Sequence, residues 1–192
     1  QSYSSRSKTV SILQGNLPIK ATRGKGIDIK FARKKYSKLL EDNSADLIIT
    51  PEGSFPTVIN EDSQTLNWIR RASYKKQAGL LIGSYCRKNE KLTNCAISIS
   101  RDQNKPAYYE KERLVPFGEY VPFYKILPGA LKKFADFIIG EGFSEGKAGK
   151  STASSIGKVG VNICFEAIYP DLLQEASLDG AKALINLSDL SW

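Results

Sequence analysis

Apolar and polar residues alternate in several short runs of the chain, a pattern typical of β-strands. The clearest run is residues 157–163, in which branched apolar residues alternate with small or polar ones, as in a buried strand. Cys164 stands at the end of this run, and Glu166 follows two residues later. α/β folds often place reactive groups at the exit of a core strand, although a lone cysteine can also serve simply as a small buried hydrophobic residue. The same pattern predicts further strands at residues 9–16, 47–50, 79–87, 93–100 and 183–192.

Apolar residues recur at helical spacing in three segments between these strands. In residues 27–42, Tyr36 and Leu40 fall on one side of the predicted helix, and residues 63–78 and 172–184 give two more helices. The resulting order is β-α-β-α-β-β-loop-β-α-β, without internal repeats or a break in composition. This order predicts an α/β fold, a sandwich of mixed sheets covered by helices.

Two segments do not follow either pattern. Residues 107–130 are rich in aromatic residues and proline with charges between them, which is typical of an ordered loop that walls a pocket. Residues 131–151 are apolar at Phe134, Phe137 and the two following isoleucines, and then rich in glycine. This segment is either an ordinary helix with a core face or an amphipathic lid that touches lipid.

The 192 residues, 41% of them hydrophobic, are enough for one domain with a sizeable core. Residues 1–8 are predicted to be the end of a linker, and residues 9–192 to form a single domain. No run approaches the roughly 18 apolar residues of a membrane span. Because the chain starts at Gln1 and stops at Trp192 within a strand-like run, we expect an upstream portion to have been removed and the domain to be truncated at its C-terminus.

The net charge of +8 favours an anionic partner, either nucleic acid or an acidic lipid surface, or it reflects only a solvated basic surface. The three cysteines show no C-x-x-C spacing, so a zinc site is not expected. Cys86 and Cys95 can face each other across a hairpin, but the sequence does not fix the register, and the redox compartment stays open. The chain has no histidine, which excludes Ser-His-Asp and Cys-His catalysis and any His-ligated metal. Neither a metal nor a cofactor is expected.

Three residues that could work together lie next to predicted strands or in the aromatic segment: Glu52, Lys111 and Cys164. A thiol needs a base or a positive field to attack at neutral pH. Glu52 can take its proton if burial raises the pKa of the carboxyl group. Lys111 can hold the oxyanion of a tetrahedral intermediate, with the backbone N–H of Phe165 as second donor. Taken singly, Glu52 and Lys111 are more often surface charges.

Three motifs occur in a fixed order: PEGSFP at 51–56, K-x-x-LVPFGEYVP at 111–122, and ICFE at 163–166 followed by YPD. Together they closely resemble the nitrilase (carbon–nitrogen hydrolase) superfamily, and LVPFGEYVP is most similar to its apolipoprotein N-acyltransferase branch. The resemblance runs from residue 10 to the end of the chain. It implies a nitrilase-like αββα sandwich.

The resemblance also implies roles for single residues. Glu52 would be the general base, Lys111 the catalytic lysine and Cys164 the nucleophile, with Phe165 supplying a backbone N–H to the oxyanion. The glutamate eight residues after the lysine, Glu119, would orient Lys111, and Glu166 would support the nucleophile. Residues expected to contact substrate are Phe117, Tyr120 and Trp192.

The branch implies an N-acyltransferase that moves an acyl chain from a phospholipid, through a cysteine thioester, to the N-terminal amine of a lipoprotein. It also implies a bacterial inner-membrane protein whose catalytic domain lies on the periplasmic side, with no nucleic-acid partner. A soluble amidase or nitrilase and an inactive binding module are the alternatives. The family's C-terminal motif commonly reads Ser-Asn-Asp-Ala-Trp-Phe, whereas residues 188–192 read Ser-Asp-Leu-Ser-Trp. This departure alters a residue that shapes the pocket and therefore bears on the choice of substrate.

Overall fold

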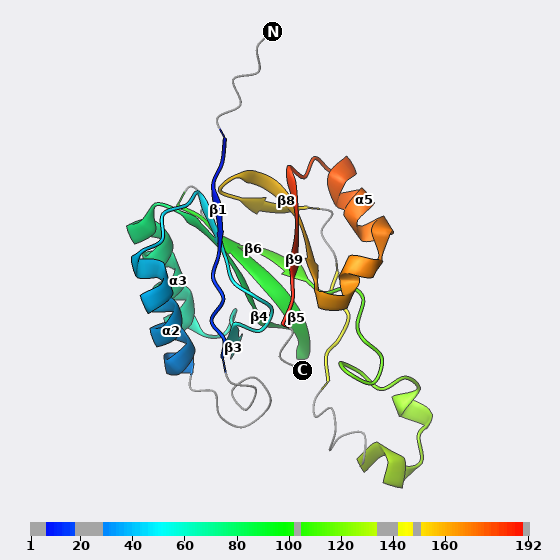
Figure 1. Cartoon of the computed structure of the whole chain (residues 1–192). Helices are drawn as coiled ribbons and strands as arrows, with labels where there is room; N and C mark the ends of the chain where they lie inside the picture. The colour runs from blue at the N-terminus through cyan, green and yellow to red at the C-terminus, as the bar shows by residue number, and fades with distance from the viewer. Residues whose placement is uncertain (1–6, 18–28, 102–104, 134–141, 148–150, 190–192) are drawn as a thin grey trace.

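The computed structural model describes residues 7–17, 29–101, 105–133, 142–147 and 151–189. Within these ranges two β-sheets pack face to face, and helices cover their outer faces (Figure 1). The described strands of the first sheet are β1 (Val10–Ile12), β2 (Leu47–Ile49), β3 (Phe55–Val58), β4 (Gly79–Lys88), β5 (Lys91–Ile99) and β6 (Ala107–Glu110). Those of the second sheet are β7 (Thr152–Ser154), β8 (Gly157–Ile163) and β9 (Ala183–Leu187).

Both sheets combine parallel and antiparallel strands. In the first sheet β1, β2 and β4 are parallel, β5 and β6 continue it in antiparallel fashion, and β3 pairs with the end of β4. In the second sheet β8 is antiparallel to β7 and parallel to β9. The residues that follow β2, β6 and β8 lie in loops and turns at the ends of these strands, where α/β folds commonly build their sites.

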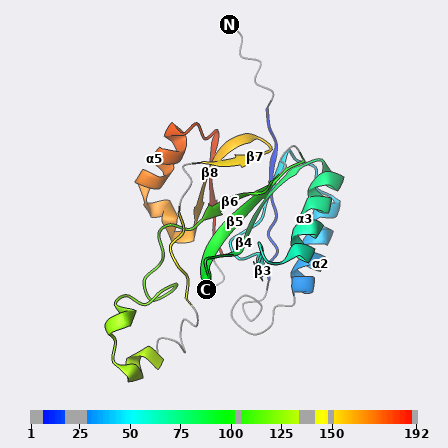
Figure 2. The ribbon, with the colours of Figure 1, turned by 180° about the vertical axis from the view of Figure 1, so that it is seen from behind.

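Two helices, α2 (Ile29–Glu41) and α3 (Ser63–Lys76), lie side by side on the outer face of the first sheet (Figure 2). Helix α2 buries Ala32, Tyr36 and Leu40 against the sheet, in agreement with the predicted spacing. Helix α3 begins after Asp62, whose carboxylate accepts the backbone N–H of Thr65 at 2.9 Å and so satisfies one of the free donors of the first turn.

Helix α5 (Pro170–Leu178) covers the second sheet (Figures 1 and 2). It packs closely on β8 because Gly160 has no side chain: an added Cβ would come within 2.8 Å of the Cβ of Ala176. Proline at the first position of α5 costs no hydrogen bond, since that N–H would have no partner in the helix.

Alternate residues of the first sheet face two different cores. Leu80 and Ile82 of β4 pack with Tyr36 beneath the helices, whereas Leu81 packs with Val161 of β8 between the sheets. Burial of both faces explains why these strands are almost continuously apolar. The layers run helix, sheet, sheet, helix, so the predicted α/β sandwich is confirmed.

Three described strands, β3, β6 and β7, were not predicted. Strand β6 lies in the aromatic segment that the sequence pattern assigns entirely to a loop. Its Tyr109 is buried and its Tyr108 is partly exposed, but an alternation over only four residues is too short to stand out from a loop. Pairing with β5 fixes this strand.

The helix predicted at 172–184 is wrong in its second half. Helix α5 ends at Leu178, and Gly180 turns the chain with a φ of +92°, which glycine adopts without strain. Strand β9 then begins at Ala183. The first strand is also shorter than predicted, since β1 ends at Ile12.

Residues 129–133 are helical, whereas the apolar residues at 134–139 that gave the segment 131–151 its two readings lie outside the described part of the chain. In the described part, no helix combines the length and apolar character that crossing a membrane requires.

The hairpin formed by β4 and β5 carries a disulfide between Cys86 and Cys95. Cys86 lies opposite Thr93 and Cys95 opposite Ser84, so the two cysteines are diagonal neighbours across the strands, with Cα atoms 5.9 Å apart. The register that the sequence leaves open therefore allows the bond. Of the three cysteines, Cys164 alone has a free thiol.

Candidate active site

Glu52, Lys111 and Cys164 follow three different strands, β2, β6 and β8, and the fold brings them together. The ammonium nitrogen of Lys111 lies 3.8 Å from Oε1 of Glu52. Both charges act on the thiol of Cys164: the negative charge of Glu52 raises its pKa and the positive charge of Lys111 lowers it. The three predicted residues therefore share one site.

The turn that carries Glu52 lies directly against β4. Gly83 makes this possible, since an added Cβ there would come within 2.1 Å of the carbonyl oxygen of Pro51 and 2.7 Å of the Cα of Glu52. The hydroxyl of Ser54 donates to the carbonyl oxygen of Gly83 at 3.0 Å and ties the turn to the strand. Gly53 has a φ of +59°, which a residue with a side chain rarely adopts.

Lys111 is only 1% exposed and lies among carboxylates. Its ammonium nitrogen is 2.9 Å from Oε1 of Glu119, at hydrogen-bonding distance. The other oxygen of Glu119 accepts the backbone N–H of Val115 at 2.9 Å, which fixes the carboxylate within its own turn. A buried ammonium requires such partners, because desolvation of an unpaired charge is costly.

Asn94 joins the two carboxylates and was missed in the sequence. Its Nδ2 donates to Oε1 of Glu52 at 2.7 Å and to Oε1 of Glu119 at 3.2 Å. Its backbone carbonyl accepts the N–H of Lys111 at 2.8 Å. The amide of this residue on β5 therefore holds both acidic partners of the lysine. In the sequence Asn94 is only a polar residue within a predicted strand. Its place beside Lys111 depends on the register of β5 with β6, which the sequence does not give.

Cys164 occupies a left-handed backbone conformation with a φ of +53°, between β8 and the 3₁₀ turn Cys164–Ile168. Such a conformation is uncommon outside glycine and is often found at functional sites. Burial and the charge of Glu52 raise the pKa of the thiol, against the lowering effects of a hydrogen bond with Ser188, of Lys111 and of the Phe165 backbone N–H. Since the net shift is upward, the sulfur needs a base to remove its proton at neutral pH.

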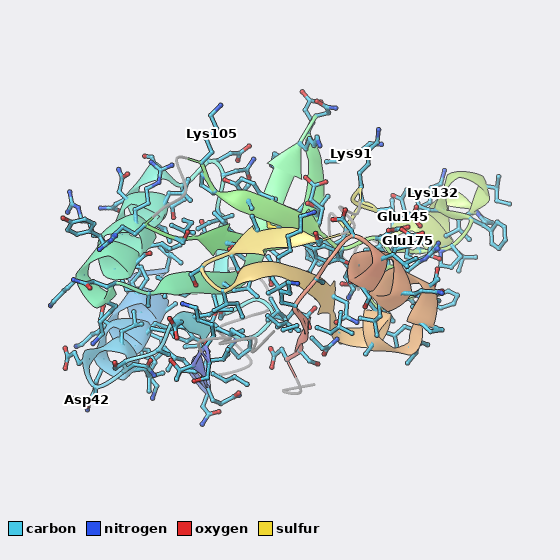
Figure 3. All side chains as sticks on the ribbon, turned by 90° about the horizontal axis from the view of Figure 1, so that it is seen from above. Asp42, Lys91, Lys105, Lys132, Glu145 and Glu175 are labelled. Atoms are coloured by element: carbon cyan, nitrogen blue, oxygen red, sulfur yellow. A yellow bond between two sulfur atoms is a disulfide. The ribbon has the colours of Figure 1, made fainter. Side chains whose placement is uncertain are left out.

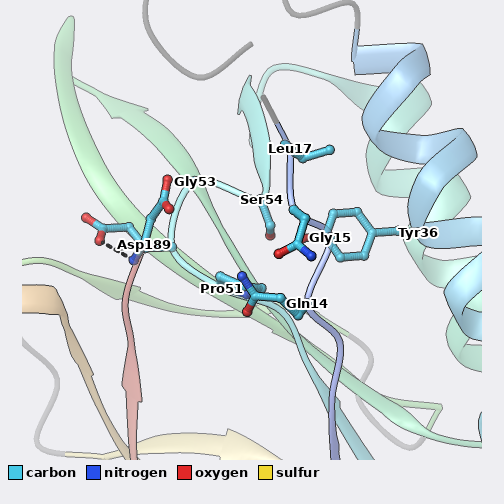
Figure 4. A pocket seen from close by; sticks show the side chains of 10 residues that line it. Gln14, Gly15, Leu17, Tyr36, Pro51, Gly53, Ser54 and Asp189 are labelled. Carbon is cyan, nitrogen blue, oxygen red and sulfur yellow. Dashed lines mark hydrogen bonds between the residues drawn. The ribbon is translucent and has the colours of Figure 1, made fainter. Parts of the chain in front are cut away.

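Glu52 has the properties of such a base. Burial raises the pKa of its carboxyl group, although Lys111 and the hydrogen bonds from Asn94 and the backbone N–H of Asp189 lower it. The Asp189 N–H donates to Oε2 at 3.2 Å (dashed line in Figure 4). A carboxylate with a raised pKa is a better proton acceptor near neutral pH than an ordinary surface glutamate.

Glu166 holds the loops around the nucleophile. It is fully buried, and its two oxygens accept hydrogen bonds from the hydroxyl of Tyr109 and from the backbone N–H groups of Glu112, Arg113 and Ile163, at 2.7–2.9 Å. One carboxylate thus connects the end of β8 to the loop that carries Lys111. The expected role of Glu166 as a support of the nucleophile stays a prediction.

Comparisons with known proteins show the family and the fold of the chain. A family model described as carbon-nitrogen hydrolase matches residues 32–192. The chain belongs to the carbon–nitrogen hydrolase family. Solved structures share its fold: an amidase from Nesterenkonia sp. has a TM-score of 0.63 at 13% identity, over 94% of this chain and 64% of the amidase. Nit3 of Saccharomyces cerevisiae, a member of the nitrilase superfamily, has a TM-score of 0.57 at 18% identity, over 84% of this chain and 58% of Nit3.

The curated relatives that match this chain include several named apolipoprotein N-acyltransferase. Apolipoprotein N-acyltransferase of Neisseria meningitidis is 30% identical over 96% of this chain and 37% of its own length. The enzyme of the same name from Synechocystis is 27% identical over 92% of this chain and 34% of its own length. The chain therefore spans about a third of the length of these relatives.

The residues expected to contact substrate lie on the surface of this carbon–nitrogen hydrolase domain, as far as the structure describes them. Phe117 is 70% exposed and adopts a φ of +62°, and its N–H donates to the carbonyl oxygen of Tyr120. Tyr120 is half-buried beside it. Phe123 and Ile126 continue this exposed apolar surface, each at 79%. Trp192 lies outside the described residues.

The arrangement suits acyl chemistry at sulfur and offers no metal site within the described residues, which contain no group of three or more His, Cys, Asp or Glu side chains able to hold an ion. A thiol, a base and an ammonium group lie together, with a backbone N–H beside the sulfur. These are the parts that nucleophilic catalysis and oxyanion stabilisation require.

Proposed function

We propose that this chain is the catalytic domain of an N-acyltransferase, which moves an acyl chain from a phospholipid to the N-terminal amine of a lipoprotein. The observation that carries the proposal is the buried Lys111, held between Glu52 and Glu119 next to the free thiol of Cys164. The relatives named apolipoprotein N-acyltransferase support the choice of reaction within the family.

In the first half of the reaction Glu52 takes the proton of Cys164, and the thiolate attacks the ester carbonyl of the phospholipid. Lys111 and the backbone N–H of Phe165 stabilise the oxyanion. Collapse breaks the ester C–O bond, Glu52 returns the proton to the leaving alkoxide, and a lysophospholipid departs. Cys164 is left as a thioester, which an amine attacks readily in the second half.

The exposed apolar segment around Phe117 and Phe123 supports a lipid substrate. It forms one end of the molecule, far from Asp42 at the opposite end, and Lys132 projects from it (Figure 3). Lys132 also lies over the ring of Tyr124, 5.7 Å from the centroid. Apolar and aromatic residues next to lysines are typical of surfaces that bind the membrane interface.

The disulfide supports an extracytoplasmic location, on the outer side of the bacterial inner membrane. Disulfides persist in oxidising compartments such as the periplasm and are rare in the cytosol. The same location argues against a nucleic acid as the partner of the basic surface.

The experiment is to incubate the protein with phospholipid in mixed micelles and to measure its intact mass. We expect a mass increase of one acyl group on Cys164, lost again when a diacylated lipopeptide with a free N-terminus is added. Cys164→Ala should show no adduct, and transfer should fall by at least about 10³-fold. If small amides are hydrolysed but no acyl-enzyme forms from phospholipid, the protein is an amidase. If neither reaction occurs, it is a binding module.

A further inference from the structure

Asn186 lies in β9 and contacts the backbone of the nucleophile. Strand β9 runs parallel to β8, and the register places Asn186 opposite Asn162, two residues before Cys164 (Figure 1). The Nδ2 atom of Asn186 donates to the carbonyl oxygen of Cys164 at 3.0 Å and to Oδ1 of Asn162 at 3.3 Å. A carbonyl oxygen only accepts hydrogen bonds, so the nitrogen of the amide must face Cys164. The proposed mechanism uses neither asparagine.

The carbonyl group that Asn186 binds belongs to the same peptide unit as the backbone N–H of Phe165. A peptide unit is planar and trans, so its C=O and N–H bonds point in opposite directions. A hydrogen bond that fixes the carbonyl of Cys164 therefore also fixes the direction of the Phe165 N–H. This N–H points towards the sulfur: burial raises the pKa of the Cys164 thiol, and the hydrogen bond from Phe165 is among the effects that lower it.

The peptide unit needs such support because the backbone before it is strained. Cys164 has a φ of +53°, in the left-handed region, which residues other than glycine keep only where their surroundings hold them. The 3₁₀ turn that starts at Cys164 cannot hold it alone, because 3₁₀ turns are built from residues with negative φ. Glu166 fixes the chain on the N-terminal side, where it accepts the N–H of Ile163 at 2.7 Å. Asn186 fixes it on the C-terminal side, at the carbonyl.

Asn162 holds the Asn186 amide in the orientation that this contact requires. Asn186 is exposed, so a freely rotating side chain would exchange its partner for water. Asn162 is only 2% exposed, and its Oδ1 takes the second N–H of the amide. The two N–H groups of Asn186 are therefore both engaged, one with the neighbouring strand and one with the nucleophile.

We infer that Asn186 is a positioning residue for the oxyanion hole: its amide holds the peptide unit between Cys164 and Phe165 so that the Phe165 N–H faces the oxygen of the attacked carbonyl group. The inference rests on the proposed function, because the oxyanion forms only in acyl transfer to the sulfur. A backbone donor helps the transition state only when it already points at the place where charge develops. Loss of the Asn186 contact should therefore slow the steps that form a tetrahedral intermediate and spare other reactions of the thiolate.

The test compares two reactions of Cys164 in Asn186→Leu protein, a substitution that keeps the shape of the side chain but removes its N–H groups. Acylation by p-nitrophenyl butyrate passes through a tetrahedral intermediate: the C–S bond forms, the ester C–O bond breaks and p-nitrophenolate leaves. Alkylation by iodoacetamide forms a C–S bond and expels iodide without an oxyanion. Both rates are measured above the pH midpoint of alkylation, where the thiol is ionised, with Cys164→Ala protein as background. We expect acylation to slow about tenfold, as for the loss of one hydrogen bond, and alkylation to change by less than about twofold.

Asn60→Leu is the matched control. The amide of Asn60 also donates to a backbone carbonyl, that of Arg87 at 2.6 Å, and its loss should leave both rates unchanged. Equal slowing of both reactions by Asn186→Leu would mean that the nucleophile itself has moved, and unchanged acylation would mean that the peptide unit needs no such support. Either result overturns the inference. If the unsubstituted protein is alkylated but not acylated, the proposed function is rejected together with the inference.

A second measurement needs no turnover. Butyraldehyde adds reversibly to the thiol: a C–S bond forms and the thiol proton moves to the aldehyde oxygen, which then occupies the place of the oxyanion. Its affinity is measured as protection of Cys164 against iodoacetamide. We expect Asn186→Leu to weaken this affinity about tenfold and Asn60→Leu to leave it unchanged. Equal affinity in the two variants would contradict the role of Asn186.

Discussion

Two buried glutamates of this domain lie in contrasting surroundings. Glu166 accepts four hydrogen bonds, all from neutral donors, and these saturate both of its oxygens. Glu52 accepts two hydrogen bonds and lies 3.8 Å from the ammonium of Lys111, beyond a short hydrogen bond. Burial raises the pKa of the Glu52 carboxyl group.

The contrast suggests different tasks for the two residues: Glu166 holds a loop, whereas Glu52 is free to exchange a proton. A carboxylate with two hydrogen-bond donors on each oxygen, three of the four being backbone N–H groups, is held in one position. A carboxylate with fewer donors, at the border of a cavity, can take up a proton at little cost. We therefore expect the region around Glu166 to contribute mainly to stability and the region around Glu52 to contribute to the proposed chemistry.

The largest effect is expected from Glu166→Gln. The amide nitrogen of glutamine cannot accept the hydrogen bonds that one oxygen of Glu166 receives, so two buried donors lose their partner. We expect the free energy of unfolding to fall by about 2–4 kcal/mol, measured from the urea midpoint and slope.

If the two regions differ as described, a substitution at Cys164 should affect the chemistry but hardly the stability. Cys164→Ala removes a half-buried thiol and should change the free energy of unfolding by no more than about 1 kcal/mol while abolishing acyl-enzyme formation. If Cys164→Ala were as destabilising as Glu166→Gln, the division between a structural and a chemical region would be wrong.

A smaller effect is expected from Gly83→Ala, which tests how closely the Glu52 turn must approach β4. The added Cβ would clash with the backbone of Pro51 and Glu52, so the turn must move outward. We expect a loss of about 1–3 kcal/mol in the free energy of unfolding and a loss of roughly 10²-fold in acylation rate through displacement of the base.

Gly129→Ala is a control for the stability measurement, because an added Cβ there meets nothing within 4 Å. It should leave the unfolding midpoint almost unchanged. A normal acylation rate in Gly83→Ala protein would show that the position of Glu52 does not depend on this contact.

Much of the site could be predicted from the sequence because its parts follow strands whose patterns are strong. Glu52 and Cys164 come after apolar runs, and Lys111 is a charge within the aromatic segment whose role the resemblance of its motif then implies. Asn94 could not be found in this way. Its side chain has meaning only once β5 lies between β4 and β6, which brings it next to Glu52 and Glu119. Such contacts depend on tertiary register, which a single sequence does not contain.

The same limit explains the errors in the fold. Strand β6 is set by pairing with β5 rather than by its own four residues. The end of α5 is set by Gly180, although the apolar spacing continues past it into β9. Helix α2 was predicted correctly because its apolar residues recur at helical spacing on one side. In the structure this side is the buried one, with Ala32, Tyr36 and Leu40 against the sheet.

The smallest expected effect is a shift in the pH dependence of Cys164 alkylation. It reports directly on the charges around the sulfur. With Cys86 and Cys95 in a disulfide, iodoacetamide reports on this thiol alone. Only the thiolate reacts, so the rate rises with pH and levels off above the pKa. In Glu52→Gln protein the midpoint should move to lower pH, because a negative charge that raises the pKa of Cys164 is gone. In Lys111→Gln protein it should move to higher pH, because a positive charge that lowers the pKa is lost.

The two opposite shifts are a stringent test of the contrast, since a general loosening of the structure would move both midpoints in the same direction, towards that of an exposed thiol. Glu175→Gln is the matched control on α5 and should leave the midpoint unchanged (Glu175 is labelled in Figure 3). Shifts of one sign in both variants, or none, would mean that neither charge acts on the sulfur. The raised pKa would then come from burial alone, and Glu52 would have no electrostatic connection with the thiol that it is proposed to deprotonate.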